Sequence, residues 1–360
     1  MKVRLLPLAI GAAIAMPGIA LADGPTVYGK MNVAFGMESL DYGYNAGYTT
    51  TDNSSDRWLL TSYDSRLGVK GSETISDSLS AIYVAEFGID VDDGTGLSQR
   101  NIYVGLKGGW GQLVAGKMDT PLKSSQGKID QFGDTTGDIK HVFVGENRAD
   151  NVVAYATPSI SGFQATVAII PGEQVDSGTN AKNGPADATS VSVTYTMDGL
   201  YAAVAADSYT PCTAYTGVKA DLSDLDKDSY TCDTTRLVGV YTMDALQVGA
   251  MYQTATTRTS GVDFDQDGFL LSVGYKIDAI KLKAQYGATT LSDNISKVDN
   301  DATLIAVGAD YILSKQTNLY VHYTSNTYKY DNAGAVAVFG ATSAKDQTRD
   351  VVDFGIVHNF

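Results

Sequence analysis

The sequence predicts an all-β fold, in which sixteen antiparallel strands form a transmembrane β-barrel. Three observations lead to this prediction. Apolar and polar residues alternate with a period of two, about sixteen segments show this alternation, and the connections between the segments are short and long in turn. A period of two places successive side chains on opposite faces of a strand. Short and long connections in turn indicate strands that run up and down, with longer loops at one end.

The first 22 residues are expected to be a signal peptide that is removed on export. A basic start at Lys2 and Arg4 precedes an apolar stretch, and the triplet Ala-Leu-Ala at 20–22 fits the small-residue rule for cleavage. Cleavage before Asp23 would leave residues 23–360 as a single barrel domain. No later segment approaches the roughly 20 apolar residues that a membrane-spanning helix needs.

The composition is acidic and rich in residues that favour strands. The formal charge of the whole chain is −15, and it becomes −17 without the two bases of the signal peptide. Such acidity argues against nucleic acid as a partner, because nucleic-acid binding selects basic surfaces. The 22 tyrosines and 37 glycines, with 44% hydrophobic residues, suit a sheet better than a disordered chain.

The alternation is clearest in three segments. From Leu59 to Val69, the odd positions are mostly apolar, while the even positions, which include Arg66 and Lys70, are mostly polar. In Leu246 to Gln253 and in Ile280 to Ala288, the even positions are apolar and the odd positions mostly polar. We expect the apolar face of each strand to meet lipid and the polar face to line the barrel.

Sixteen segments are predicted to be strands: 26–37, 57–71, 78–91, 99–108, 111–118, 149–157, 162–170, 189–197, 200–208, 235–243, 246–257, 268–277, 280–291, 302–312, 317–330 and 347–360. Both ends of this series fall at the end with short connections, so the first and last strands can pair and close the sheet. Closure is required in a bilayer, because lipid offers no hydrogen bonds to an open edge.

One short phrase recurs at three of the short connections. "YTMDGL" begins at Tyr195, "YTMDAL" at Tyr241 and "YKIDAI" at Tyr275. Asp followed by a small residue is typical of a tight turn. Each tyrosine precedes its turn by a few residues, where an aromatic girdle is expected at the membrane interface.

Cys212 and Cys232 are the two cysteines, and both fall in or beside one predicted long loop, 209–234. An exported chain meets an oxidising compartment. A disulfide between Cys212 and Cys232 is therefore expected.

Several stretches resemble the general porins of Gram-negative bacteria. They are "TVYGKMNVAFG" from Thr26, "SRLGVKGSETISDSLSAIYVAEFGID" from Ser65, "RNIYVGLKGGWGQLVAGKMDTPL" from Arg100, "DQFGD" from Asp130, "RADNVVAYATPSISGFQATVAI" from Arg148 and the ending "VVDFGIVHNF". The resemblance implies a homotrimer in the outer membrane, in contact with lipid and lipopolysaccharide. It also implies a water-filled pore in each barrel, short periplasmic turns, and a third outer loop that folds inward and narrows the pore.

The connection 119–148 has the length and the position of this inward loop. It carries five acids that are candidates for one side of the constriction: Asp119, Asp130, Asp134, Asp138 and Glu146. The resemblance places bases on the facing wall at Lys30, Arg66 and Arg100. Lys70 shares the polar face of Arg66, and Lys117 and Arg148 flank the loop, so these three complete the predicted basic wall.

The expected function is passive diffusion of small hydrophilic solutes and ions, filtered by size and charge at the narrowest point. Acidity at the mouths favours cations, whereas bases at the constriction favour anions, so the ion preference is left open. The alternative is a substrate-specific channel on the same barrel that prefers anions, with Lys281 and Lys283 as further bases inside it. A purely structural or adhesive barrel is a further possibility, and it would not conduct.

An enzyme and a metal site find little support. A hydrolase needs a nucleophile beside an oriented histidine, and no such motif surrounds His141, His322 or His358. "DFDQDG" at Asp263–Gly268 begins like a calcium loop, but Gly274 stands where the loop needs Glu. This stretch and "DLSDLDKD" at 221–228 are predicted to be solvated acidic loops, and no metal or other cofactor is expected.

Overall fold

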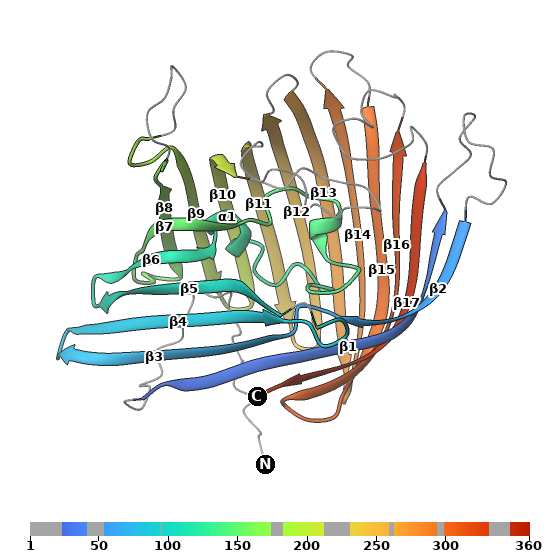
Figure 1. The fold of residues 1–360 in the computed structure, drawn as a ribbon, viewed down its shortest axis with the longest axis horizontal. Coiled ribbons are helices and arrows are strands. Elements are labelled where there is room, and N and C mark those ends of the chain that lie inside the picture. The colour runs from blue at the N-terminus through green and yellow to red at the C-terminus, as the bar shows by residue number, and fades with distance from the viewer. Residues whose placement is uncertain are drawn as a thin grey trace.

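The computed structural model describes residues 24–41, 54–94, 96–173, 183–211, 231–258, 263–293, 299–330 and 346–360. Most of them belong to one antiparallel sheet of seventeen strands that closes on itself. Closure joins β1 (Thr26–Asp41) to β17 (Gln347–Asn359) in a register that runs from Lys30 opposite Asn359 to Asp41 opposite Thr348. Figure 1 shows β17 beside β1, with the upright strands β9 to β16 forming one side of the barrel.

The remaining strands follow one another around the barrel. They are β2 (Ser54–Ser62), β3 (Arg66–Ser76), β4 (Leu79–Ile89), β5 (Leu97–Gly108), β6 (Gly111–Asp119), β7 (Arg148–Ala156), β8 (Phe163–Ile170), β9 (Ala188–Met197), β10 (Leu200–Pro211), β11 (Thr231–Met243), β12 (Leu246–Arg258), β13 (Asp263–Ile277), β14 (Ile280–Asp293), β15 (Asp299–Ile312) and β16 (Thr317–Tyr330). β2 pairs with β1, and from β3 onward each strand pairs with the next in sequence, which is the up-and-down order expected from alternate short and long connections.

The period of two separates two environments. On β14, Leu282 and Tyr286 point outward and are 46% and 41% exposed. The residues between them point inward, where Lys283 pairs with Asp310 and Gln285 contacts the loop between β6 and β7. An apolar outer face in contact with lipid and a polar inner face are what a water-filled barrel requires.

The repeated phrase forms tight turns, as predicted. Asp198, Asp244 and Asp278 have φ angles of 48°, 49° and 50°, in the left-handed region that Asp tolerates better than most residues. Each begins a two-residue turn between paired strands. Tyr241 and Tyr275 are exposed on the outer face just before their turns, at the level predicted for the aromatic girdle.

The second predicted strand differs from expectation. It is divided into β2 and β3, and both parts pair with β1, which gives seventeen strands in place of sixteen. Val33 lies opposite Ser62, but Gly29 lies opposite Leu67, so the register shifts by one residue. A shift of one residue exchanges the two faces of a strand.

This exchange corrects the faces predicted for Leu59 to Val69. Trp58 and Leu60 are exposed on the outer face before the shift, and Leu67 is exposed on it afterwards. Trp58 stacks on Phe35 of β1 with ring centroids 5.0 Å apart. The prediction that odd positions keep one face throughout is therefore wrong for β2 and right for β3.

The extra residue lies in the segment 63–65, which side-chain hydrogen bonds hold to the wall. Asp64 has a φ of 48°. The Tyr63 hydroxyl donates to Asp353, and the Ser65 hydroxyl accepts from the backbone N–H of Asn32. Such a bulge re-aims the side chains beside it. Here it directs Asp64 into the barrel.

Several strands extend further toward the long loops than predicted. The calcium-like stretch Asp263–Gly268, predicted to be a loop, is the first part of β13. Asp265 accepts from the Thr256 hydroxyl and Asp267 from the Tyr252 hydroxyl, both on β12. Pairing with neighbouring strands thus overrides the loop-like composition. The stretch 221–228 and the predicted signal peptide lie outside the described residues.

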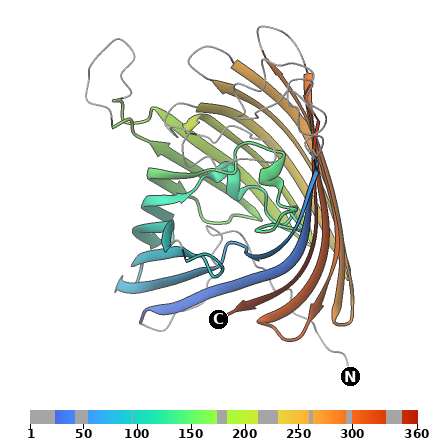
Figure 2. The same cartoon turned by 45° about the vertical axis from the view of Figure 1, so that its right-hand side comes forward.

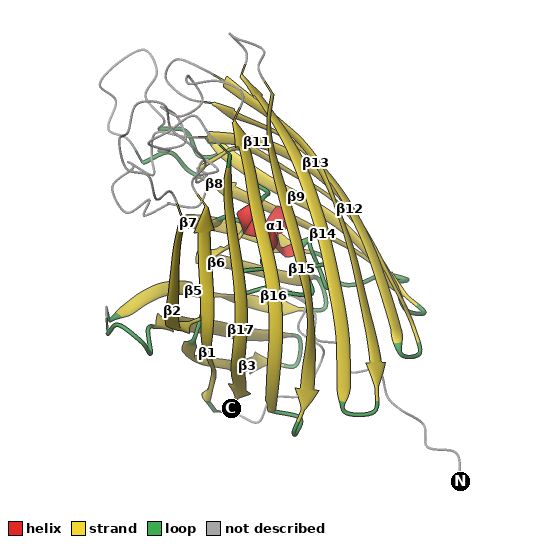
Figure 3. Ribbon diagram, turned by 90° about the vertical axis from the view of Figure 1, so that its right-hand side faces the viewer, coloured by secondary structure: helices red, strands yellow, loops and turns green. Residues whose placement is uncertain are grey.

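The connection between β6 and β7 lies inside the barrel. It contains α1 (Pro121–Ser124) and a 3-10 turn at Ile139–His141, and Figures 2 and 3 show it enclosed by the strands. We call residues 120–147 the inner loop. No helix in the described part of the chain is long and apolar enough to cross a membrane.

Cys232 is fully buried in β11 and lies 3.4 Å from the Thr257 hydroxyl. Cys212 lies outside the described residues, so its disulfide with Cys232 stays a prediction. We expect alkylation of the unfolded protein to modify both cysteines only after reduction, as mass spectrometry would show. Replacing both by serine should destabilise the folded protein by about 3 kcal/mol, since the bridge restrains the unfolded chain. Alkylation without reductant would contradict the bridge.

Candidate functional site

Four amide side chains of the barrel wall hold the backbone of the inner loop. We call them the wall amides: Gln253, Gln266, Gln285 and Asn326. They donate to the carbonyl oxygens of Val144, Val142, Gly137 and Thr136 at 2.8, 3.1, 3.0 and 3.1 Å, respectively. Gln285 and Gln266 also accept from the backbone N–H groups of Gln131 and Val144. An amide suits this position because it both donates and accepts.

Apolar contacts complete the attachment of the inner loop. Its buried side chains Ile129, Phe132, Ile139, Val142 and Phe143 pack on inward-facing apolar residues of the wall, among them Val238, Met251, Leu270 and Leu304. These wall residues depart from the polar character of a barrel interior. They are apolar because the inner loop covers them, so one part of the interior is a packed core and the pore is confined to the rest.

The inner loop brings Asp134 to the opposite wall. Its Oδ2 lies 2.8 Å from Lys30 Nζ on β1 and 3.0 Å from Arg66 Nη1 on β3. Burial alone would raise the pKa of Asp134, but Lys30 and Arg66 hold that pKa below its usual value. The Asp134 carboxylate is therefore charged at neutral pH.

Two acids of the wall join these bases. Glu86 Oε1 lies 2.8 Å from Arg100 Nε, and Glu86 Oε2 lies 3.9 Å from Arg66 Nε. Asp64, in the bulge, accepts from Arg100 Nη1 at 2.7 Å and from Lys140 Nζ of the inner loop at 3.2 Å. Asp64 thus connects the basic wall to the loop a second time.

These contacts form one ion-pair network of alternating charge. Its bases are Lys30, Arg66, Arg100 and Lys140, and its acids are Asp64, Glu86, Asp134 and Asp138, the last lying 3.7 Å from Lys140. Burial would lower the pKa of Lys140, yet Asp138 and Asp64 raise it above its usual value. Four positive and four negative charges balance, so the ion-pair network is polar without a net charge.

The other predicted bases have different positions. Lys70 is on β3 and places its ammonium group 4.9 Å from the centre of the Tyr28 ring. Lys117 lies on the face of β6 opposite to buried Val114 and Met118, where it pairs with the exposed Asp150, so it does not join the ion-pair network. The period of two is the physical reason, because Lys117 shares the outer face of β6 with exposed Leu113.

The remaining predicted residues hold the ends and the interior of the inner loop. Arg148 and Lys123 both pair with Asp119 where the loop begins and ends, at 3.0 and 3.1 Å. Glu146 pairs at 2.7 Å with Arg236 of β11, whose side chain is fully buried. Of the five predicted acids, only Asp134 and Asp138 belong to the ion-pair network.

Asp130 folds the inner loop on itself. Its two carboxylate oxygens accept from the backbone N–H groups of Phe132 and Ile139. Burial, reinforced by the nearby charge of Asp138, raises the pKa of Asp130 to about 8. Burial also lowers the pKa of His141 in the same loop to about 4, so this histidine is neutral at pH 7.

Sequence reasoning missed Asp64, Glu86 and Arg236 as site residues. The period of two was sufficient to find Glu86, which lies between the outward-facing Ala85 and Phe87 and opposite Gly68 on β3. Asp64 gives no such signal, because its orientation depends on the bulge. Arg236 is recognisable as an inward-facing base on β11, but its partner comes from a loop 90 positions earlier in the sequence.

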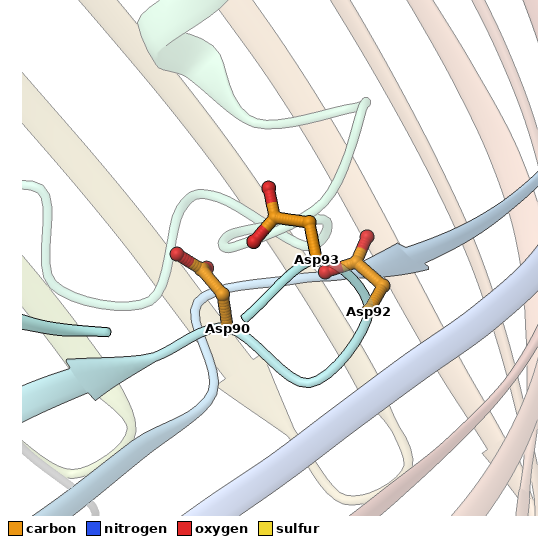
Figure 4. A group of neighbouring side chains, drawn as sticks. All are labelled: Asp90, Asp92 and Asp93. Carbon is orange, nitrogen blue, oxygen red and sulfur yellow. The ribbon is translucent and has the colours of Figure 1, made fainter. Parts of the chain in front are cut away.

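A separate group of three carboxylates lies where β4 ends (Figure 4). Asp90, Asp92 and Asp93 are exposed, and one oxygen of each lies within 4.8 Å of the others. The Asp92 carboxylate also accepts from the backbone N–H of Ser62 at 3.1 Å. Exposed acidic groups of this kind are common without an ion, and we assign no metal to them.

Comparisons with known proteins give the same architecture. Among solved structures, an anion-selective porin from Comamonas acidovorans has a TM-score of 0.68 at 20% identity, covering 94% of this chain and 99% of that one. The trimer form of OmpT from Vibrio cholerae has a TM-score of 0.64 at 19% identity, covering 94% and 100%. At these identities the likeness shows the fold alone.

Similar sequences include outer-membrane proteins of two genera. The major outer membrane protein P.IB of Neisseria gonorrhoeae is 25% identical over 72% of this chain and 73% of its own length. An outer membrane porin of Bordetella pertussis is 30% identical over 46% of each chain, so this alignment spans about half of that protein. The sequence model of the Gram-negative porin family matches residues 9–332. The chain therefore belongs to the Gram-negative porin family and is an outer-membrane β-barrel protein.

Proposed function

We propose that the barrel conducts ions and small hydrophilic solutes by passive diffusion, and that the ion-pair network borders its constriction. One observation carries this proposal: the wall amides fix the inner loop inside the barrel, and the loop then places Asp134 within 3.0 Å of Lys30 and Arg66. A barrel of this size is too wide for wall side chains alone to fill. The inner loop therefore sets the size of the passage.

The filter at this point acts on size and polarity. Fixed charges of opposite sign on loop and wall orient water across the passage. A solute that passes displaces this water, and its own polar groups must replace the lost interactions. Apolar solutes offer none, so they are disfavoured. The relatives are porins, and we propose transport without a chemical step, without a metal and without another cofactor.

We further propose a homotrimer that is surrounded by outer-membrane lipid and lipopolysaccharide. The related structure of OmpT was solved as a trimer form. Strands β6 and β7 have 9 residues and β8 has 8, at or just below the lower limit of the 9–11 or so that span a bilayer. A neighbouring copy against this low side would shield it from lipid.

The alternative, a substrate-specific channel that prefers anions, has one observation in its favour. The acids of the ion-pair network are all paired with bases, whereas Lys70, Lys128 and Lys281 form no ion pair with a carboxylate among the residues that the structure describes. These three lysines add positive charge on the inner surface of the barrel, and long-range attraction inside a narrow passage favours anions.

Planar-bilayer recordings of the purified protein test both functions. Unitary current steps in KCl support a channel, and steps in groups of three support the trimer. The reversal potential under a salt gradient gives the ion preference. Saturation of the current by one solute would favour the substrate-specific channel, and the absence of steps would refute both.

Replacing Arg66 by alanine should shift the ion preference toward cations. The substitution removes one of the two bases that neutralise Asp134 and leaves excess negative charge at the passage. We expect the cation-to-anion permeability ratio to rise about threefold, equivalent to about 0.7 kcal/mol. Arg66→Lys serves as the matched control and should keep the original ratio. An unchanged reversal potential in Arg66→Ala would count against this position for the constriction.

Replacing Arg236 by methionine should loosen the inner loop, because it leaves Glu146 buried without its base. Breaking a buried pair in this way costs roughly 3–5 kcal/mol. We expect noisier single-channel currents and a lower temperature of thermal unfolding by circular dichroism. The double variant Arg236→Met with Glu146→Gln should recover most of the loss, because the buried charge is gone. Equal defects in the single and double variants would show that the pair does not fix the loop.

A further inference from the structure

Two lysines face each other across neighbouring strands at the end of the barrel with short turns. Lys276 of β13 lies directly opposite Lys281 of β14, one residue pair before the turn at 278–279. Both share the inward face, since Gly274 and Lys283 form the next inward pair. Side chains directly opposite in a ladder have Cβ atoms about 5 Å apart, and two like charges there destabilise the sheet.

A third lysine joins them from the inner loop. The stem of Lys281 and the side chain of Gln131 both fill the space beside Gly274: a Cβ at that glycine would lie 3.1 Å from Lys281 Cε and 3.0 Å from Gln131 Oε1. Gln131 Nε2 donates to the carbonyl oxygen of Lys128 at 3.2 Å. Lys128 therefore lies close enough for its charge to repel that of Lys281, although the charge of Asp310 on β15 acts on Lys281 more strongly and in the opposite sense.

No described carboxylate forms an ion pair with Lys128, Lys276 or Lys281. The contrast with the next lysine is direct, because Lys283 Nζ lies 3.0 Å from Asp310 and 4.6 Å from the centre of the Phe132 ring. Asp310 also binds His322 at 3.0 Å, so its charge is already shared. Asp310 also lies directly opposite Lys281 in the ladder with β15, so the structure gathers three positive charges on the inner surface beside one acid that is already paired with Lys283.

We propose that Lys128, Lys276 and Lys281 form a binding site for a polyvalent oxyanion, such as a phosphate group of a small solute, at the short-turn mouth of the pore. Three ammonium groups match the charge and the several acceptor oxygens of a phosphate, and lysine binds phosphate as a point charge. The proposal rests on the proposed channel function and gives the anion-preferring alternative a specific site. This site is distinct from the ion-pair network, whose charges cancel.

The site explains why a like-charged pair is compatible with the fold. Lys276 lies at the rim and is exposed, so water screens part of the repulsion when no anion is bound. An oxyanion between the lysines turns the repulsion into attraction. A divalent or trivalent anion gains more than chloride, because the attraction grows with the charge of the ligand.

Single-channel recording with inorganic pyrophosphate as the probe tests the site. At about 0.1 M KCl, where screening is moderate, we expect added pyrophosphate to reduce the unitary current of the unmodified channel. The double variant Lys276→Gln with Lys281→Gln should need about tenfold more pyrophosphate for half-block, as expected for the loss of two nearby charges. Asp310→Asn, which frees Lys283, should need less than the unmodified channel.

Lys315→Gln provides the matched control, since Lys315 is an exposed lysine in the short turn between β15 and β16. It should leave the half-block concentration unchanged. Unitary conductance in 1 M KCl shows that each variant is folded. Current steps without a pyrophosphate effect, or an equal effect in the double variant, would overturn the site and leave the channel function standing. Absence of current steps in the unmodified protein would overturn the channel itself.

Discussion

The need to satisfy every backbone hydrogen bond without help from solvent governs this structure. Lipid supplies no partners, so the sheet must close, and β1 and β17 pair over twelve positions to close it. The same need recurs inside the barrel. The inner loop covers apolar wall residues and so loses water on that side, and the wall amides replace that water at the carbonyl oxygens of residues 136–144. Closure makes the barrel, and the wall amides make the passage narrow.

The closed sheet and the loop held by the wall amides together determine where the charged residues lie. A loop fixed by its backbone presents its acids at defined positions, so Asp134 meets Lys30 and Arg66 although more than sixty residues separate them in sequence. The barrel wall also departs from regular strand geometry close to these charges. The bulge before β3 inserts one residue, reverses the faces of the strand and turns Asp64 toward Arg100 and Lys140. A regular strand would have left Arg100 and Lys140 without this shared partner.

The sequence was sufficient for whatever depends on short-range patterns. Period two assigned the faces of β12 and β14, and Asp with a small neighbour marked the turns at Asp198, Asp244 and Asp278. The sequence was insufficient wherever the orientation or the partner of a side chain depends on how the strands are aligned with each other. Trp58 and Leu60 point outward although alternation continued from β3 would place them inward, because the bulge at 63–65 shifts the register. Glu146 was predicted to be an acid of the constriction, whereas in the structure it pairs with the buried Arg236 of β11. Such pairings join distant segments, and no local pattern encodes them.

The distribution of charge, more than its total, determines what this pore discriminates. A formal charge of −15 suggests a channel for cations. Yet the acids of the ion-pair network are each matched by a base, and acids such as Asp265 and Asp267 point to the outer face of the barrel. A permeating ion inside the passage is screened from those outer charges by distance and water. Lys70 and Lys281, by contrast, point into the barrel and form no ion pair with a described carboxylate. We therefore expect the ion preference to depend on the few charged residues that face the pore, although the chain as a whole is acidic.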